Sequence, residues 1–364
     1  MEAELFEAVN ANPEAAVTID AQELNYISFA GLRVLMKLRK QAGKALPVLN
    51  VSPEVYSIFD VTGFTELLEV HKALRQLSVE GLPVISQGAT ATVYRIDRET
   101  IAKVFRPNTS LRLNQWGNER SRNAFVNGIP TAIAYDMVKV GDCYGLVYEL
   151  LDDVDFLTIL ENDKAHLDEH IEKFARAIKA MHQIEVDPSR FPSAKQGSLA
   201  SVPMMSALCT PEERKKLRRL YESIPDRSTF LHADCHPGNV MVQDWEFVFI
   251  DMMTCGSGHP VYDLGSMCSL YHMPPFGRRE ESPMIRNFTD EERARIWDVY
   301  LGTYLDTKDK ALMKKAEWQI AAIAAACSML LEVYFPGSME PERITFLKRT
   351  ALEYVVDGLE PICF

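Results

Sequence analysis

The chain has 364 residues, and its content of 47% hydrophobic, 25% charged and 9% aromatic residues excludes a disordered or fibrous protein. At roughly 150 residues per domain, this length predicts two or three domains with separate cores. The formal net charge of −12 opposes binding to nucleic acid phosphates and to anionic lipid, so we expect neither a nucleic acid nor a membrane as partner.

Cysteine usage and the distribution of apolar residues predict a cytoplasmic protein. The 7 cysteines form no C-x-x-C pair and are odd in number, which argues against a disulfide framework or a structural zinc site. The first residues, MEAELFEAVN, lack the basic and apolar regions of a secretory signal. The longest apolar run, residues 320–331, is shorter than the ~20 residues that cross a bilayer, and it predicts a buried core helix instead.

Residues 1–80 alternate between helix and strand patterns. Helices are predicted at 2–9, at 29–41 and from Ser52-Pro53 to a break at 61–64, and strands are predicted at 16–20 and 46–51. This alternation predicts a sheet with helices packed on it, an α/β unit. The residues that follow, 71–82, are charged and predict a helical connector.

Two strings in this unit carry a family resemblance over residues 17–70, VTIDAQELNYISFAGLRVLMKLRK and LPVLNVSPEVYSIFDVTGFTELLEV. They resemble the STAS domain of bacterial anti-sigma factor antagonists, although the first strands of that family have no counterpart here. The regulatory phosphoacceptor of the family falls at Phe29, which has no hydroxyl group, so phosphorylation at the usual position is excluded. We interpret the adjacent Ser28 as the N-cap of the following helix, with phosphorylation of Ser28 as the alternative.

A second unit begins at Pro83 and changes character near residue 150. Its first part has strand patterns at 92–96, 101–105, 132–140 and 144–148. Its second part has helix patterns at 167–182, 211–223, 290–305, 312–334 and 342–356, with strand patterns at 240–243 and 247–250. The sequence therefore predicts three parts, residues 1–80, 83–150 and 151–364.

The strongest chemical signal is the string HADCHPGNVMVQDWEFVFIDMMTCGSGHPVYDLG, residues 232–265. Asp234 precedes Asn239 by five residues, and Asp251 ends the second strand of the hairpin that follows. Phosphoryl transfer from a nucleotide requires a carboxylate to orient or deprotonate the acceptor hydroxyl, and oxygen ligands to hold Mg²⁺ at the phosphates. Asp234, Asn239 and Asp251 match that requirement in type, order and spacing.

The same string resembles the aminoglycoside phosphotransferase and choline kinase-like family, and the resemblance extends over residues 83–364. It implies an α+β, two-lobed protein-kinase-like domain, with a small β-rich lobe and a large helical lobe, and ATP and Mg²⁺ as cofactors. It also implies that Asp234 is the catalytic base and that Asn239 and Asp251 are the metal ligands. Asp263 is implied to brace the catalytic loop, and Ala233 stands where glycine is more usual.

The histidines and cysteines of this string have both structural and chemical interpretations. His232 and His236 suggest metal binding or acid–base chemistry, but in kinase-like loops the first histidine packs and holds the loop by hydrogen bonds, and we favour that role. Irregular spacing favours buried apolar thiols over a soft-metal cluster for Cys235, Cys255 and Cys268.

The first part of the second unit is expected to bind the nucleotide. Ser86, Gly88 and Thr90 lie between two strand patterns, where small and hydroxyl residues offer donors to phosphate oxygens, although one glycine is a weak signal beside G-x-G-x-x-G. Lys103 in the next strand is expected to contact the α- and β-phosphates. Glu119 of the following helix is its expected acidic partner, with a solvated carboxylate as the alternative.

The string LVYELL, residues 146–151, resembles the hinge between kinase lobes, where main-chain groups bind the adenine edge. Glu149 and Leu151 are therefore expected to contact the cofactor. Since any main-chain donor would serve there, the residue types constrain the choice of nucleotide only weakly.

These observations predict an ATP- and Mg²⁺-dependent phosphotransferase that acts on a hydroxyl group of a small molecule of the aminoglycoside, amino alcohol or sugar type. The alternative is a regulatory kinase-like or nucleotide-binding protein whose STAS-like residues 1–80 recruit a protein partner. A third interpretation is that residues 1–80 serve for self-association through an exposed sheet edge.

Overall fold

The structure, a computed structural model, describes residues 2–11, 17–43, 46–88, 90–107, 109–151, 154–273, 284–356 and 362–364. The chain divides into two compact units. The first comprises Met1–Gly81 with Met137–Gly145, and the second comprises Leu82–Asp136 with Leu146–Phe364.

The first unit contains a three-stranded parallel sheet in the order β1-β2-β3. Its elements are α1 (Glu2–Ala11), β1 (Ile19–Asp20), α2 (Phe29–Ala42), β2 (Pro47–Val51), α3 (Pro53–Val61), α4 (Phe64–Leu67) and β3 (Glu69–Lys72). Helix α2 turns its apolar face inward, and its buried side chains form one core with those of β2 and α3, namely Leu32, Leu35, Leu38, Val48, Val51, Val55 and Phe59. The predicted α/β unit is confirmed.

Ser28 is the N-cap of α2. Its hydroxyl oxygen accepts a hydrogen bond from the Gly31 N–H at 3.3 Å, which satisfies one of the donors that a helix leaves unpaired in its first turn. The predicted cap is confirmed. The next residue, Phe29, is 78% exposed, so the position of the family's phosphoacceptor presents an aromatic ring to solvent.

Replacing Ser28 by Ala is expected to destabilise α2 by about 1 kcal/mol, because the Gly31 N–H loses its acceptor. Amide hydrogen exchange of residues 29–42 in the full chain measures this as roughly fivefold faster exchange. Ser57→Ala in α3 is the matched control, since that hydroxyl only donates back to the Pro53 carbonyl oxygen at 3.0 Å. Parental exchange rates in the Ser28 variant would contradict this role for the cap.

The connector after residue 70 is extended, so the predicted helix at 71–82 is wrong. Strand β4 (Arg75–Gln76) pairs in parallel with Val138 and Lys139, and the Leu77 N–H donates to the Lys139 carbonyl oxygen at 2.9 Å. The free edge of a strand offers a row of unpaired peptide groups, which an extended segment satisfies and a helix does not. This pairing depends on residues more than sixty positions away, and the local charge pattern does not contain it.

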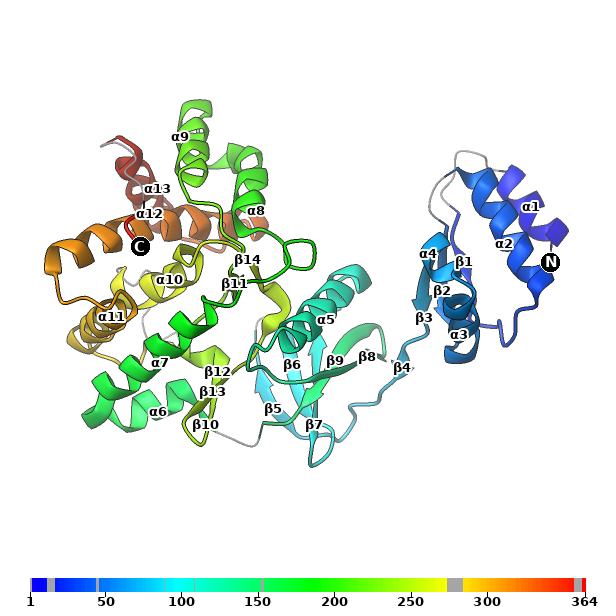
Figure 1. The fold of residues 1–364 in the computed structure, drawn as a ribbon, viewed down its shortest axis with the longest axis horizontal. Helices are drawn as coiled ribbons and strands as arrows, with labels where there is room; N and C mark the ends of the chain where they lie inside the picture. The colour runs from blue at the N-terminus through cyan, green and yellow to red at the C-terminus, as the bar shows by residue number, and fades with distance from the viewer. Residues whose placement is uncertain are drawn as a thin grey trace. The chain divides into compact units, whose positions relative to one another are not determined.

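Strands dominate the residues that follow. Strands β5 (Val84–Gln87), β6 (Ala91–Arg95), β7 (Thr100–Phe105), β8 (Ala134–Val140) and β9 (Cys143–Glu149) lie in a sheet of order β4-β8-β9-β7-β6-β5. The helix α5 (Leu111–Val126) follows β7 (Figure 1) and packs against residues 252–254. This β-rich part with one helix matches the predicted small lobe.

The remainder is mainly helical and is coloured green to red in Figure 1. Its helices are α6 (Phe156–Asn162), α7 (Leu167–Met181), α8 (Ala194–Ser201), α9 (Pro211–Glu222), α10 (Val261–Met267), α11 (Asp290–Tyr304), α12 (Lys310–Tyr334) and α13 (Pro341–Val356). Two small sheets join β10 (Val154–Asp155), β12 (Val240–Gln243) and β13 (Glu246–Phe249), and β11 (Phe230–Leu231) with β14 (Gly256–Ser257). The five long helices predicted here are confirmed.

Helix α12 is long and apolar enough, by length and composition alone, to cross a membrane. In the structure it packs against α10 and α13, and Ile320, Ala322 and Ala325 are fully buried. A Cβ atom added at Gly265 of α10 would lie 3.3 Å from the Ala324 Cβ, so small residues allow the two helices to approach closely. The predicted core helix is confirmed.

Candidate active site

Asp263 holds the loop formed by residues 232–239, which follows β11. Its side chain is fully buried, and its two carboxylate oxygens accept the N–H groups of His232 at 2.8 Å and Ala233 at 2.7 Å. His182 Nε2 donates to the same carboxylate at 3.0 Å. Burial alone would raise the pKa of Asp263, but the hydrogen bonds and the His182 partner lower it below its usual range. The predicted brace is confirmed.

His232 links the loop to the end of β13. Its Nδ1 accepts the Asp234 N–H at 3.3 Å, so the ring proton is on Nε2, which donates to the Ile250 carbonyl oxygen at 2.9 Å. The ring is fully buried. His232 therefore holds the loop, as predicted.

Ala233 adopts a left-handed backbone conformation, with φ of 66°. Steric strain makes this conformation about 1–2 kcal/mol less favourable for alanine than for glycine. Against this, glycine gives the unfolded chain more conformational entropy, which lowers the stability of the folded chain by about 0.4–1 kcal/mol. We therefore expect Ala233→Gly to raise the free energy of unfolding by about 0.5–1 kcal/mol, measured by urea denaturation. Ala180→Gly in the last turn of α7 is the control and should lower it. Destabilisation by both variants would contradict the expectation.

Asp234 and Asn239 are in direct contact. Asn239 Nδ2 donates to Asp234 Oδ2 at 3.1 Å and to the Asp234 carbonyl oxygen at 2.9 Å. Because the amide nitrogen is engaged with Asp234, the amide oxygen of Asn239 is the group left to bind a cation. The Asp234 side chain is 53% exposed, so a hydroxyl group from solvent can reach the carboxylate.

Asp251 lies beside this pair, at the end of the β12–β13 hairpin. The Ile250 N–H donates to the Asn239 carbonyl oxygen at 2.9 Å, which places Asn239 opposite the residue before Asp251. Asp251 has a left-handed backbone, with φ of 65° and ψ of 46°, a conformation that non-glycine residues adopt at a cost and that is common at functional sites. Its carboxylate forms an ion pair with Lys103 Nζ at 2.7 Å.

Lys103 belongs to β7, where its neighbours Ala102 and Val104 are buried. Alternation along the strand places its side chain on the other face, toward Asp251. The expected partner, Glu119, is exposed on α5, and the prediction of a Lys103–Glu119 pair is wrong for this structure. The side of α5 that packs inward includes Gly117, where an added Cβ atom would lie 2.4 Å from Met253 Cε, and this face does not include Glu119.

The β5–β6 turn contains the residues expected at the phosphates. The Gly88 N–H donates to the Ala91 carbonyl oxygen at 2.9 Å, and Ser86 and Thr90 are exposed. Ala89 lies outside the described residues. Sequence reasoning missed Arg106. Its side-chain Nη2 donates to the Gly88 carbonyl oxygen at 2.9 Å, and its main-chain N–H donates to the Thr90 carbonyl oxygen at 3.1 Å. A basic residue three positions after Lys103 is the signal that would have suggested it.

The two residues expected at the hinge, Glu149 and Leu151, differ in how their polar groups are bonded. Glu149 Oε1 accepts the Ile133 N–H at 2.9 Å, and the Glu149 N–H donates to the Ile133 carbonyl oxygen at 3.1 Å, so this side chain has a structural role. Within the described part of the chain, no acceptor pairs with the Leu151 N–H. The Leu151 N–H is therefore a main-chain donor that a ligand could reach.

The remaining histidine and the cysteines of the motif are largely buried. Burial lowers the pKa of the His236 imidazole, against the opposing effect of the Asp234 charge. Cys235, Cys255 and Cys268 are buried free thiols, and burial raises the pKa of Cys255 to about 12. The predicted interpretation of these cysteines as buried apolar residues is confirmed.

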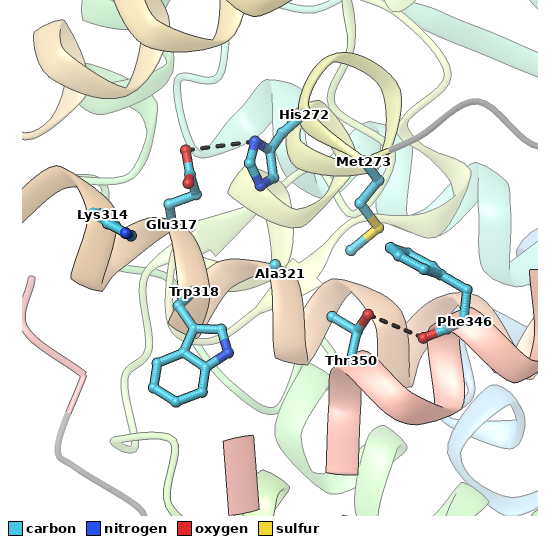
Figure 2. A pocket seen from close by; sticks show the side chains of 8 residues that line it. All are labelled: His272, Met273, Lys314, Glu317, Trp318, Ala321, Phe346 and Thr350. Carbon is cyan, nitrogen blue, oxygen red and sulfur yellow. Dashed lines mark hydrogen bonds and ion pairs between the residues drawn. The ribbon is translucent and has the colours of Figure 1, made fainter. Parts of the chain in front are cut away.

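A cavity of about 380 Å³ lies apart from these residues, between the π-helical turn Cys268–His272, α12 and α13 (Figure 2). On one side, His272 Nδ1 lies 3.5 Å from Glu317 Oε2, which also accepts the Trp297 Nε1–H at 2.7 Å. His272 follows Asp263 by nine residues along the helix, roughly 13 Å, so the cavity is at the end of α10 away from the 232–239 loop.

Two family models match the chain, and they match different parts of it. The model of the phosphotransferase enzyme family matches residues 81–304, and the model of the Mlab, STAS domain matches residues 1–69. No curated protein matches the chain with significant similarity.

The solved structures that match the chain include three small-molecule phosphotransferases and kinases. Aminoglycoside phosphotransferase APH(2'')-Ib, bound to ADP, has 17% identity and a TM-score of 0.50 over 76% of this chain and 95% of that chain. The streptomycin–ATP complex of APH(2'')-IIa has 16% identity and a TM-score of 0.48 over 75% of this chain and 94% of that chain. Amicoumacin kinase hAmiN has 15% identity and a TM-score of 0.49, and the match covers 85% of this chain and 97% of that chain.

The first of these similarities shows the two-lobed kinase-like fold. The family model covers more than half of the chain, and it includes Lys103, the 232–239 loop, Asp251 and Asp263. The chain therefore belongs to the phosphotransferase enzyme family, and residues 1–69, before the phosphotransferase part, match the STAS domain model.

Proposed function

We propose that the protein transfers the γ-phosphate of ATP to a hydroxyl group of a small molecule in a Mg²⁺-dependent reaction. The observation that carries this proposal is a set of linked contacts: Lys103 pairs with Asp251, the main chain of the adjacent Ile250 bonds to that of Asn239, and the Asn239 amide donates to Asp234. It brings an ammonium group, two oxygen donors for a cation and an exposed carboxylate to one place. Phosphoryl transfer needs this set, because catalysis consists mainly of positioning and charge stabilisation.

The residues present fit a magnesium ion. Mg²⁺ prefers hard oxygen ligands and usually takes only one or two from the protein together with phosphate oxygens. Asn239, through its amide oxygen, and Asp251, through its carboxylate, would hold the ion. When bound, Mg²⁺ neutralises charge on the phosphates. Without a cation, Lys103 supplies the positive charge beside Asp251.

The other residues have separate roles in the proposal. Asp234 accepts the proton of the attacking hydroxyl, and Lys103 contacts the α- and β-phosphates. The turn with Ser86, Gly88 and Thr90 covers the phosphates with N–H and O–H donors. At the hinge, the Glu149 carbonyl accepts from the adenine amino group and the Leu151 N–H donates to the ring. The exposed Asp234 carboxylate supports the first of these assignments, and the Leu151 N–H, which has no acceptor among the described residues, supports the last.

A ligand panel tests this function on the full chain. The midpoint of thermal unfolding is measured with ATP, GTP and Mg²⁺, and then with kanamycin, choline and a neutral sugar added to the nucleotide. ADP release is followed in the same mixtures. We expect ATP with Mg²⁺ to raise the midpoint, and one acceptor class to raise it further and to stimulate ADP release. No protection by any nucleotide would contradict the proposal.

Residues 1–80 are proposed to bind a protein partner or a second copy of the chain. Tyr26 and Phe29 are 72% and 78% exposed, and β1 pairs only with β2 among the described residues. An exposed aromatic pair and an open strand edge are features of interaction surfaces. The molar mass of the full chain in solution over a range of concentrations, with and without a Phe29→Ser substitution, tests self-association. A monomer at every concentration would exclude the second copy.

A further inference from the structure

His236 lies two residues after Asp234 and is 15% exposed. Its Nδ1 accepts the Gly238 N–H at 3.1 Å. An imidazole nitrogen that accepts a hydrogen bond carries no proton, so the proton of this ring is on Nε2. The tautomer of His236 is therefore set by the main chain of its own loop.

The Nε2–H of His236 faces the Asp234 carboxylate. His236 Nε2 lies 3.7 Å from Asp234 Oδ1, while Asp234 Oδ2 accepts from Asn239 Nδ2 at 3.1 Å. Each oxygen of the carboxylate thus has an N–H group on its side. The distance to His236 is longer than a hydrogen bond, and contacts of catalytic groups are often long until the substrate is bound.

The imidazole ring is held on two sides. A Cβ atom added at Gly238 would lie 3.2 Å from His236 Cε1 and 2.7 Å from Met284 Sδ, so the ring, the bare glycine and the methionine are packed closely. This packing, together with the Gly238 hydrogen bond, restricts rotation of the imidazole. A restricted N–H donor can fix the orientation of the carboxylate that it faces.

We propose that His236 is a positioning residue for Asp234: its Nε2–H orients the carboxylate so that one oxygen is presented to the acceptor hydroxyl. This inference rests on the proposed function. It also excludes a proton relay through the ring, because Nδ1 is occupied by the Gly238 N–H and Nε2 already carries a proton. The proton taken from the hydroxyl therefore stays on Asp234 until it leaves to solvent.

Two substitutions separate the two hydrogen bonds of the ring. His236→Asn keeps an oxygen that can cap the Gly238 N–H, as asparagine does at helix starts, but its amide is too short to reach Asp234. His236→Gln has a longer side chain that carries an N–H group toward Asp234. We expect His236→Asn to lower kcat for ADP formation roughly 10- to 100-fold with little change in the KM for ATP, because misplacement of a reacting group acts on the chemical step. His236→Gln should recover part of the rate.

A double-mutant cycle tests whether His236 acts through Asp234. In an Asp234→Asn background, adding His236→Asn should cause no further loss, since residues that act as a unit are not additive. Thermal unfolding of each variant monitors the fold. Independent losses in the cycle, a raised KM for ATP, or equal losses in the asparagine and glutamine variants would overturn the proposal in favour of a merely structural role.

The outcomes also separate this inference from the proposed function. If the parent and His236→Asn form ADP equally fast while Asp234→Asn is impaired, the positioning role fails and the phosphotransferase assignment stands. If the parent consumes no ATP with any acceptor, the proposed function fails and the inference fails with it.

Discussion

Replacing Asp234 by Asn is expected to lower the rate of phosphoryl transfer by about 10²–10⁴-fold, the usual contribution of a general base. Asparagine keeps the size of the side chain and can still contact Asn239, but it cannot accept the proton of the acceptor hydroxyl. The measurement is kcat for ADP formation with saturating ATP and Mg²⁺. Because the side chain is 53% exposed, we expect the thermal unfolding midpoint to stay close to that of the parent.

Asp244→Asn provides the matched control. Asp244 lies in the β12–β13 turn, is exposed and has a φ of 49°, a conformation that asparagine also tolerates. The same chemical change at this position should leave kcat unaltered. If the Asp234→Asn variant has the activity of the parent, the Asp234 carboxylate is not the general base.

The largest effect on stability is expected for Asp263→Asn, about 3–5 kcal/mol, because buried donors that the carboxylate accepts would be left unsatisfied at about 1–3 kcal/mol each. The variant keeps the size of the side chain but loses the charge that faces His182, and its amide presents N–H groups where the main chain of His232 and Ala233 also donates. Urea denaturation measures the loss. Asp298→Asn, at an exposed pair with Lys310, is the control and should change stability little.

The lowered pKa of Asp263 predicts that the free energy of unfolding depends on pH. The pKa of Asp263 is lower in the folded chain than its usual value of 3.8, so its contribution to stability is fully present above that value. The contribution is lost as the pH falls through the lower, folded pKa. The difference in stability between the parent and Asp263→Asn should therefore be constant near neutral pH and shrink in acid, below about pH 4. A difference that does not depend on pH down to the acid limit would contradict the role of the ionised carboxylate.

Local sequence patterns were sufficient to predict the arrangement of those site residues that lie close together in the sequence. The spacing of Asp234 and Asn239 and the hairpin before Asp251 predict their proximity, because a short loop and a two-stranded turn leave few other arrangements. The N-cap at Ser28 is likewise a property of four consecutive residues. In each case the geometry is set by hydrogen bonds between near neighbours.

Contacts between distant segments were not predictable in the same way. The pairing of β4 with β8 depends on an unpaired strand edge far along the chain. The ion pair of Lys103 with Asp251, instead of Glu119, depends on which face of α5 packs against Met253. Helical periodicity identifies an apolar face but does not indicate which segment covers it, so the partners of Lys103 and Arg106 required the structure.

Transfer of a labelled γ-phosphate tests the central claim most directly. The full chain is incubated with ATP labelled at the γ-phosphate, Mg²⁺ and the aminoglycoside, amino alcohol and sugar acceptors in turn, and the label in each acceptor is counted. We predict label in one acceptor class with the parent, and a loss of about 10²–10⁴-fold in rate with Asp234→Asn. Absence of label from every acceptor although the chain binds ATP, or equal labelling by the parent and the variant, would contradict the account.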